Sequence, residues 1–157
     1  MFKEKKKSVA FLSILSNAVI ILLKIIASVL CGSISILSEA VHSLGDLCAS
    51  VLTLYSVSKS CEPADKEHPF GHGKYEDLSG FIEGWLIIFA AIYIFLEAGK
   101  KIMSNNTVMD TTPALIVMGI SFVLNIIVSS ILMKTAKQTN SMALLADAQH
   151  LRSDIYS

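Results

Sequence analysis

Two nine-residue stretches decide how this sequence is interpreted: residues 38–46 have the sequence SEAVHSLGD, and residues 146–154 have the sequence ADAQHLRSD. Each contains a histidine followed four positions later by an aspartate, namely His42 with Asp46 and His150 with Asp154. Side chains with this spacing lie on one face of a helix, about one turn apart. Both stretches belong to apolar regions, where ionisable groups are costly and therefore point to function.

The surrounding composition predicts an all-α membrane protein built as a bundle of transmembrane helices. Hydrophobic residues make up 53% of the 157-residue chain and charged residues 17%, with a mean hydropathy of +0.61. Soluble domains usually carry about a quarter charged residues, and about 18 apolar residues suffice to cross a bilayer. The formal net charge of zero gives no indication of a nucleic-acid partner.

Four apolar spans and part of a fifth are predicted. The first is too long for a secretory signal and has no small-residue cleavage pattern, so we expect a retained helix. The fifth apolar run continues to the last residue of the sequence, so we expect a truncated polypeptide. The predicted spans are 8–30, 34–58, 78–102, 113–133 and 141–157.

The distribution of lysines predicts a cytoplasmic N-terminus. Lysines accumulate in cytoplasmic loops, and here they precede the first span and occur between the second and third spans and between the fourth and fifth. Lys100 and Lys101 fall on the other side and oppose the pattern. The supporting residues are Lys3, Lys5, Lys6, Lys7, Lys59, Lys66, Lys74, Lys134 and Lys137.

Depth in the bilayer offers a separate test of whether the two His-Asp pairs meet. Counted from the cytoplasmic ends of their spans, Asp46 and His150 lie about 18 Å and 16 Å deep. His42 and Asp154 lie about 24 Å and 22 Å deep on the same helical rise. We therefore expect the four side chains to surround one ion.

Two imidazoles and two carboxylates suit a tetrahedral Zn²⁺ site, and the carboxylates would neutralise the charge of the ion. Imidazole also suits Fe²⁺, Co²⁺ or Ni²⁺, so ligand type alone does not select the metal. The alternative is that each pair is a satisfied polar contact between helices. The duplicated, depth-matched pairs favour a metal site.

The loop between the second and third spans holds the other two histidines of the chain. Residues 62–76 have the sequence EPADKEHPFGHGKYE, in which Asp65, His68 and His72 are candidate ligands for a second, more exposed metal ion. A solvated polar turn shaped by Pro69 and the glycines is the alternative. The loop taken alone does not distinguish the two.

These motifs, with the loop segment HPFGHGK at residues 68–74, closely resemble the cation diffusion facilitators over essentially the whole chain. The resemblance implies six transmembrane helices, a cytoplasmic C-terminal domain, and homodimers that exchange metal for protons. By this resemblance, residues 1–157 are expected to be the N-terminal part of the transmembrane domain, without the sixth helix and the C-terminal domain. It also implies a transport site and a loop site, and a histidine at position 42 resembles the zinc-selective members. These sites would consist of His42, Asp46, His150 and Asp154, and of Asp65, His68 and His72.

The resulting prediction is a secondary transporter, not an enzyme, that exports Zn²⁺ across the cell (inner) membrane, with Fe²⁺, Co²⁺ or Cd²⁺ as other candidate substrates. Protons compete with metal for the same ligands. The alternatives are a non-transporting fragment that associates with a longer copy and a haem-binding or other metal-binding membrane protein. The Asp that follows each His disfavours haem, and an intramembrane metalloprotease motif, His-Glu-x-x-His, is missing.

Other polar residues in the spans have predicted structural roles. Asn17 and Asn125 are expected to form interhelical hydrogen bonds, and Lys24 to snorkel or to pair with an internal acid. Asp147, one turn from His150, is expected either to pair helices or to help admit ions. Cys31 and Cys48 are expected to be buried thiols, and no disulfide is expected from three cysteines; Cys61, in the loop, is weak evidence for metal binding.

Overall fold

A computed structural model describes residues 2–31, 34–103 and 112–156, and these residues form five helices and no strand. The predicted all-α class is confirmed. The expected turn at residues 31–33 falls largely outside the described residues, as does the connection at 104–111. The helices are α1 (Phe2–Cys31), α2 (Ile34–Ser60), α3 (Lys74–Met103), α4 (Thr112–Thr139) and α5 (Met142–Tyr156).

The helices reach further than the predicted apolar spans at the end of the bundle where the N-terminus lies. The first helix begins at Phe2 instead of Ser8, and the third begins at Lys74 instead of Leu78. The fourth continues to Thr139, past Met133. Hydropathy marks only the apolar part of a helix, whereas lysine, glutamate and glutamine are good helix formers in water. The polar ends therefore continue the helices.

A tight turn separates α4 from α5. Asn140 has a φ of 49°, in the left-handed region that commonly ends a helix. The amide of Ser141 donates to the carbonyl of Ala136 at 3.1 Å, which is the six-to-one bond of a Schellman cap. The hydroxyl of Ser141 then accepts from the amide of Leu144 at 3.5 Å. One short turn thus ends α4 and starts α5 in the opposite direction.

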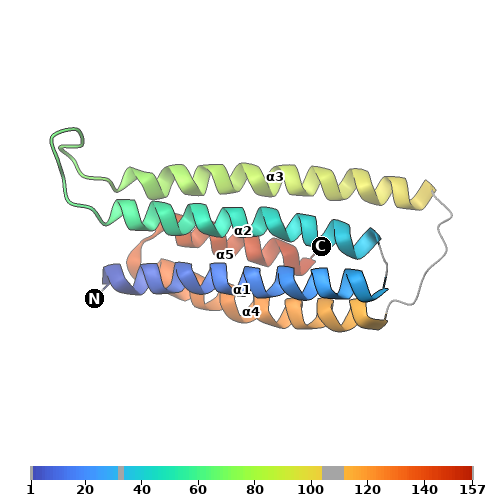
Figure 1. Ribbon diagram of the computed structural model, residues 1–157. Coiled ribbons are helices and arrows are strands. Elements are labelled where there is room, and N and C mark those ends of the chain that lie inside the picture. The colour runs from blue at the N-terminus through green and yellow to red at the C-terminus, as the bar shows by residue number, and fades with distance from the viewer. Residues whose placement is uncertain (1, 32–33, 104–111, 157) are drawn as a thin grey trace.

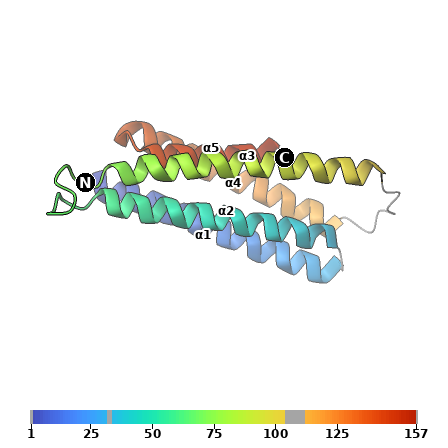
Figure 2. The same ribbon diagram turned by 90° about the horizontal axis from the view of Figure 1, so that it is seen from above.

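The short helix α5 lies inside the bundle. It contacts α4, α3 and α2, while α1 packs against α2 and α4. Figures 1 and 2 show that the loop of residues 61–73 projects from the same end of the bundle as the N-terminus, and that the C-terminus lies part of the way along the helices. Buried side chains of α5 join the main apolar cluster, among them Ala143, Leu144, Ala148 and Leu151.

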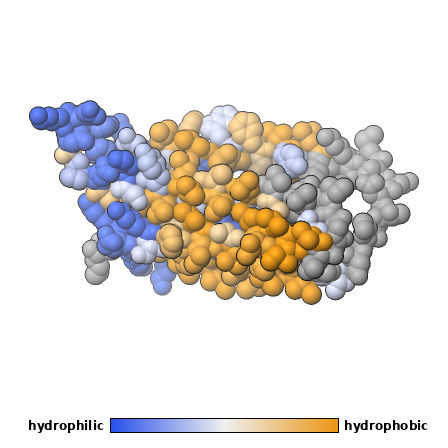
Figure 3. All heavy atoms as spheres, viewed as in Figure 1, coloured by the Kyte–Doolittle hydropathy of each residue, from blue (hydrophilic) through white to orange (hydrophobic). Residues whose placement is uncertain are grey.

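The middle of the face seen in Figure 3 is largely apolar, and hydrophilic residues gather at one end of it. Within the described residues, three helices are long and apolar enough to cross a membrane: Lys3–Val29, Lys74–Leu96 and Leu115–Thr139. Of the other two helices, α5 has only 15 residues, and both α2 and α5 carry the His-Asp pairs. Most large side chains of α3 face outward, including Phe81, Trp85 and Phe89, and only 11% of its apolar window is buried. The chain is therefore a multi-pass membrane protein.

The described cysteines lie away from the interior of the bundle. Cys48 is on its outer surface, on the face of α2 opposite the inward-facing Asp46 and Ser50. Cys61 is partly exposed and also free. The side chain of Cys31 lies outside the described residues.

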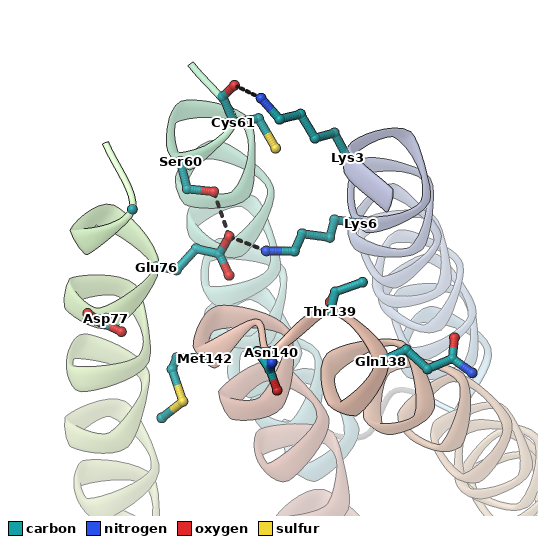
Figure 4. A pocket seen from close by; sticks show the side chains of 11 residues that line it. Lys3, Lys6, Ser60, Cys61, Glu76, Asp77, Gln138, Thr139, Asn140 and Met142 are labelled. Atoms are coloured by element: carbon teal, nitrogen blue, oxygen red, sulfur yellow. Dashed lines mark hydrogen bonds and ion pairs between the residues drawn. The ribbon is translucent and has the colours of Figure 1, made fainter. Parts of the chain in front are cut away.

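Four helices are tied together at the polar end by the carboxylate of Glu76, on α3 (Figure 4). Lys6 of α1 binds Glu76 Oε1 at 2.8 Å, and Ser60 of α2 donates to the same oxygen at 2.5 Å. Ser141, directly before α5, donates to Oε2. Only 6% of Glu76 is exposed, so this cluster closes the bundle at that end.

Replacing Glu76 with alanine is expected to destabilise the chain by about 1–3 kcal/mol, because the buried hydroxyl of Ser141, the half-buried hydroxyl of Ser60 and the ammonium of Lys6 lose their acceptor. Thermal or denaturant unfolding in detergent measures this change. Glu62→Ala is the matched control, since Glu62 is exposed and its carboxylate pairs with the neighbouring Lys59 at 3.0 Å. The control should change stability by less than about 0.5 kcal/mol, and equal losses in both variants would show that Glu76 does not fasten the helices.

Candidate metal site

The antiparallel helices α2 and α5 bring the two His-Asp pairs together inside the bundle. Nε2 of His150 lies 3.0 Å from Oδ1 of Asp46. Nε2 of His42 lies 3.9 Å from the same oxygen and 4.0 Å from Oδ1 of Asp154. The pairs that meet across the helices are the ones that depth counting had placed at the same level, Asp46 with His150 and His42 with Asp154.

Asp46 is the centre of this cluster. One oxygen of its carboxylate faces both imidazoles, and the side chains of Asp46 and His150 are 9% and 4% exposed. His42 and Asp154 are more accessible, at 21% and 15%. The cluster therefore has a buried side, formed by Asp46 and His150, and a more open side toward the far end of the bundle.

Two nitrogens of the cluster, Nε2 of His42 and Nδ1 of His150, are buried and have no hydrogen-bond partner among the described residues. Ligand atoms of His42, Asp46 and Asp154 all lie within 4.8 Å of one another, and His150 contacts Asp46 directly. A small contraction would bring imidazole and carboxylate atoms to about 2 Å from a shared ion. The donor set suits Zn²⁺ and its neighbours among the transition metals.

Small polar side chains hold Asp46 and its helix in position. Asn17 of α1 donates to the backbone carbonyl of Asp46 at 3.4 Å and to the hydroxyl of Ser50 at 2.8 Å. Ser13 shares a hydrogen bond of 3.0 Å with Ser50. The predicted interhelical role of Asn17 is confirmed. The amide oxygen of Asn125, by contrast, is buried without a hydrogen-bond partner in the part of the chain that the structure describes.

Lys24 adds a positive charge beside the cluster. Its ammonium donates to the hydroxyl of Ser43 at 2.8 Å, and it interacts electrostatically with Asp154. The lysine therefore turns toward an internal acid, one of the two roles predicted from the sequence.

The three loop residues also come together. Asp65 lies 3.5 Å from Nδ1 of His68 and 3.6 Å from Nε2 of His72, and the two imidazole rings are 4.4 Å apart. His72 is buried and its ring stacks on Tyr75, whereas Asp65 is exposed. Ligand atoms of the three residues lie within 4.8 Å of one another, so the loop is a second candidate site.

Backbone amides organise the loop around Asp65. The amides of His68 and Glu67 donate to Oδ1 of Asp65 at 2.6 Å and 2.9 Å. The hydrogen bond from His68, above all, lowers the pKa of the Asp65 carboxyl below its usual value of 3.8. The ionised carboxylate that a metal requires is thus favoured before any ion binds.

The sequence did not assign a role to Glu83, which is fully buried on α3 and accepts hydrogen bonds from Thr53 and Ser79. A signal for it was present in α2, where Asp46, Thr53 and Ser60 recur every seven residues. Such a recurrence places polar groups along one inward face. Each of these residues either is an acid or binds one.

The fold and the cluster define a class: a multi-pass helical membrane protein with imidazole and carboxylate groups converging inside the bundle. Residues 10–157 match the cation efflux transmembrane domain. The chain therefore belongs to the cation efflux family, which confirms the resemblance to cation diffusion facilitators.

Individual relatives agree with this assignment. The chain is 35% identical over 135 residues to an uncharacterized transporter of Synechocystis. The aligned region covers 86% of this chain and 44% of that protein. It is 32% identical over 149 residues to the cation-efflux pump FieF of Serratia proteamaculans, covering 95% and 50%. It is 35% identical over 138 residues to FieF of Shigella boydii, covering 88% and 46%. The chain spans about half the length of these relatives.

The folded conformation of the loop is expected to lose stability at low pH. The folded loop lowers the pKa of Asp65. The ionised carboxylate therefore stabilises the folded loop fully above the ordinary pKa of 3.8, and this stabilisation is lost as pH falls through the lowered value. NMR titration should show the His68 amide moving with a midpoint below 3.8. Asp65→Asn removes the titrating group and should abolish that movement, and a wild-type midpoint at or above 3.8 would contradict the assignment.

Proposed function

We propose that this chain forms the ion-translocating part of a secondary transporter that exports a divalent cation from the cytoplasm, Zn²⁺ before Fe²⁺, Co²⁺ or Cd²⁺, in exchange for protons. The observation that carries the proposal is the convergence of His42, Asp46, His150 and Asp154 between α2 and α5. In this proposal the metal is the substrate, and these four residues are its ligands.

The donor types support Zn²⁺ as the preferred substrate. Two carboxylates balance the charge of a divalent ion, which makes its burial between helices tolerable. Two imidazoles favour zinc and its transition-metal neighbours over Mg²⁺ and Mn²⁺, which suit oxygen ligands. Asp65, His68 and His72 form a second, loop site for the same class of ion.

The direction of transport follows from the proposed orientation. Lysines of α1, α2, α3 and α4 gather at the end of the bundle where the N-terminus and the loop lie, which is the hydrophilic end in Figure 3. The positive-inside rule favours the cytoplasmic side for such an end. Ions would then leave the cytoplasm past the Glu76 cluster, which must open, and reach Asp46 near the middle of the bundle.

Proton exchange follows from the same ligands. A histidine that holds a metal must be deprotonated, so a proton and the metal exclude one another at His42 and His150. Protons from outside would displace the ion once the helices rearrange to expose the site, as in alternating access, and would return to the cytoplasm on the emptied ligands. As in the family, we propose that two copies act together.

Asp46→Asn is expected to weaken Zn²⁺ binding by at least about tenfold, because it removes the charge that faces both imidazoles. Calorimetric titration of the purified chain in detergent measures this affinity, and a chelator should release the ion from the wild-type chain. In proteoliposomes, zinc-dependent proton movement should fall to background.

Asp77→Asn is the matched control, since Asp77 is an exposed acid in the first turn of α3. It should bind Zn²⁺ as the wild type does. His68→Ala should remove only binding that belongs to the loop. Unchanged affinity in Asp46→Asn would rule out Asp46 as a ligand.

A further inference from the structure

A second pair of carboxylates lies in the bundle between the Glu76 cluster and Asp46. Glu83 of α3 and Asp147 of α5 are both 0% exposed, and neither belongs to the four-residue site described above. They interact electrostatically with each other. Two such acids in one interior need an explanation, because buried charges are expensive unless they are paired.

The helix α2 holds the two acids at neighbouring levels. Thr53 donates to Oε1 of Glu83 at 2.5 Å, and Ser50, three positions earlier on α2, donates to Oδ1 of Asp147 at 3.2 Å. Residues three apart on a helix are neighbours, with Cβ atoms about 5–6 Å apart. The two carboxylates therefore lie at successive levels of α2, one to two turns from Asp46 toward the Glu76 end.

Only half of each carboxylate is satisfied. Ser79 also donates to Oε1 of Glu83, at 3.0 Å, so the hydroxyls serve that one oxygen. The second oxygens, Oε2 of Glu83 and Oδ2 of Asp147, are buried and have no hydrogen-bond partner in the part of the chain that the structure describes. Hydroxyl donors orient a carboxylate but do not cancel its charge.

We propose that Glu83 and Asp147 form a second cation site, built from oxygen ligands, where a divalent ion pauses between the polar end of the bundle and the His-Asp cluster. The unpartnered oxygens Oε2 and Oδ2 are its charged ligands. The hydroxyls of Ser50, Thr53 and Ser79 fix the other oxygens and complete the polar lining.

Charge and ligand type support this assignment. Two carboxylates match the charge of one divalent ion, as in the His-Asp cluster. Without imidazole, the site binds hard ions such as Mn²⁺ relatively well and transition metals more loosely. A looser site before a tighter one suits transit, because an ion must be able to leave it. This role in transit rests on the proposed function, whereas binding itself does not.

The site lies along a polar line on α2. Asp46, Ser50, Thr53 and Ser60 face the same way, and the last three bind Asp147, Glu83 and Glu76 in turn. Val57, which is fully buried, interrupts the line between Thr53 and Ser60. The buried apolar side chain of Val57 therefore separates the second site from the Glu76 cluster.

Manganese binding to the purified chain tests the proposal. Electron paramagnetic resonance of added Mn²⁺ should report a bound ion in a variant with all four histidines replaced by alanine, which lacks the imidazoles of both other sites. Adding Glu83→Gln to that variant should weaken the binding by at least about tenfold, and Asp147→Asn should act likewise. Glutamine keeps the acceptor oxygen for Thr53 and Ser79, so the fold should persist.

Glu62→Gln in the same background is the matched control, because it removes an exposed acid, and it should leave Mn²⁺ binding unchanged. Manganese binding that survives Glu83→Gln, or that is absent from the start, overturns the proposal. A protonated-carboxyl infrared band that persists under saturating Mn²⁺ and disappears in Glu83→Gln also overturns it, since the pair would then hold a proton. Zinc binding tests the proposed transport site separately: it should be lost in Asp46→Asn and kept in Glu83→Gln. The two proposals can therefore fail independently of each other.

Discussion

The structure depends on keeping carboxylates inside a membrane-embedded bundle. The helix α2 does this with a single inward face that runs from Asp46 through Ser50 and Thr53 to Ser60. Each position either is an acid or donates to one from another helix. Because an unsatisfied charge in the interior costs several kcal/mol, this face fixes how α3 and α5 lie against α2. The arrangement of the other helices follows from it.

The short helix α5 is the element that makes a site out of this face. It is enclosed by α2, α3 and α4, and its buried alanines, Ala143 and Ala148, allow its backbone to approach its neighbours closely. The turn at Asn140 reverses the chain directly after α4, so that His150 arrives opposite Asp46. A bulky residue in place of either alanine would move the imidazole away from its partner without touching a ligand.

The two ends of the bundle differ in character. At the hydrophilic end, Glu76 joins Lys6, Ser60 and Ser141 and so holds four helices together. Toward the other end, His42 and Asp154 are the more accessible members of the His-Asp cluster. The structure is thus closed on the side from which the proposed substrate comes. Transport in this scheme requires the Glu76 cluster to separate while the interior acids keep their hydroxyl partners.

The sequence by itself determined the all-α class, the number of helices and the two His-x-x-x-Asp pairs, because hydrophobic runs and four-residue spacing are local properties. The sequence also predicted that His150 and Asp46 lie at the same depth in the bilayer, because each residue of a helix adds a fixed rise. The tertiary structure alone decided which oxygen faces the imidazoles, that Cys48 points outward, and that Glu83 and Asp147 are both buried against the polar face of α2. These depend on the rotation of each helix about its axis, which is set by packing between distant segments and which no local pattern encodes.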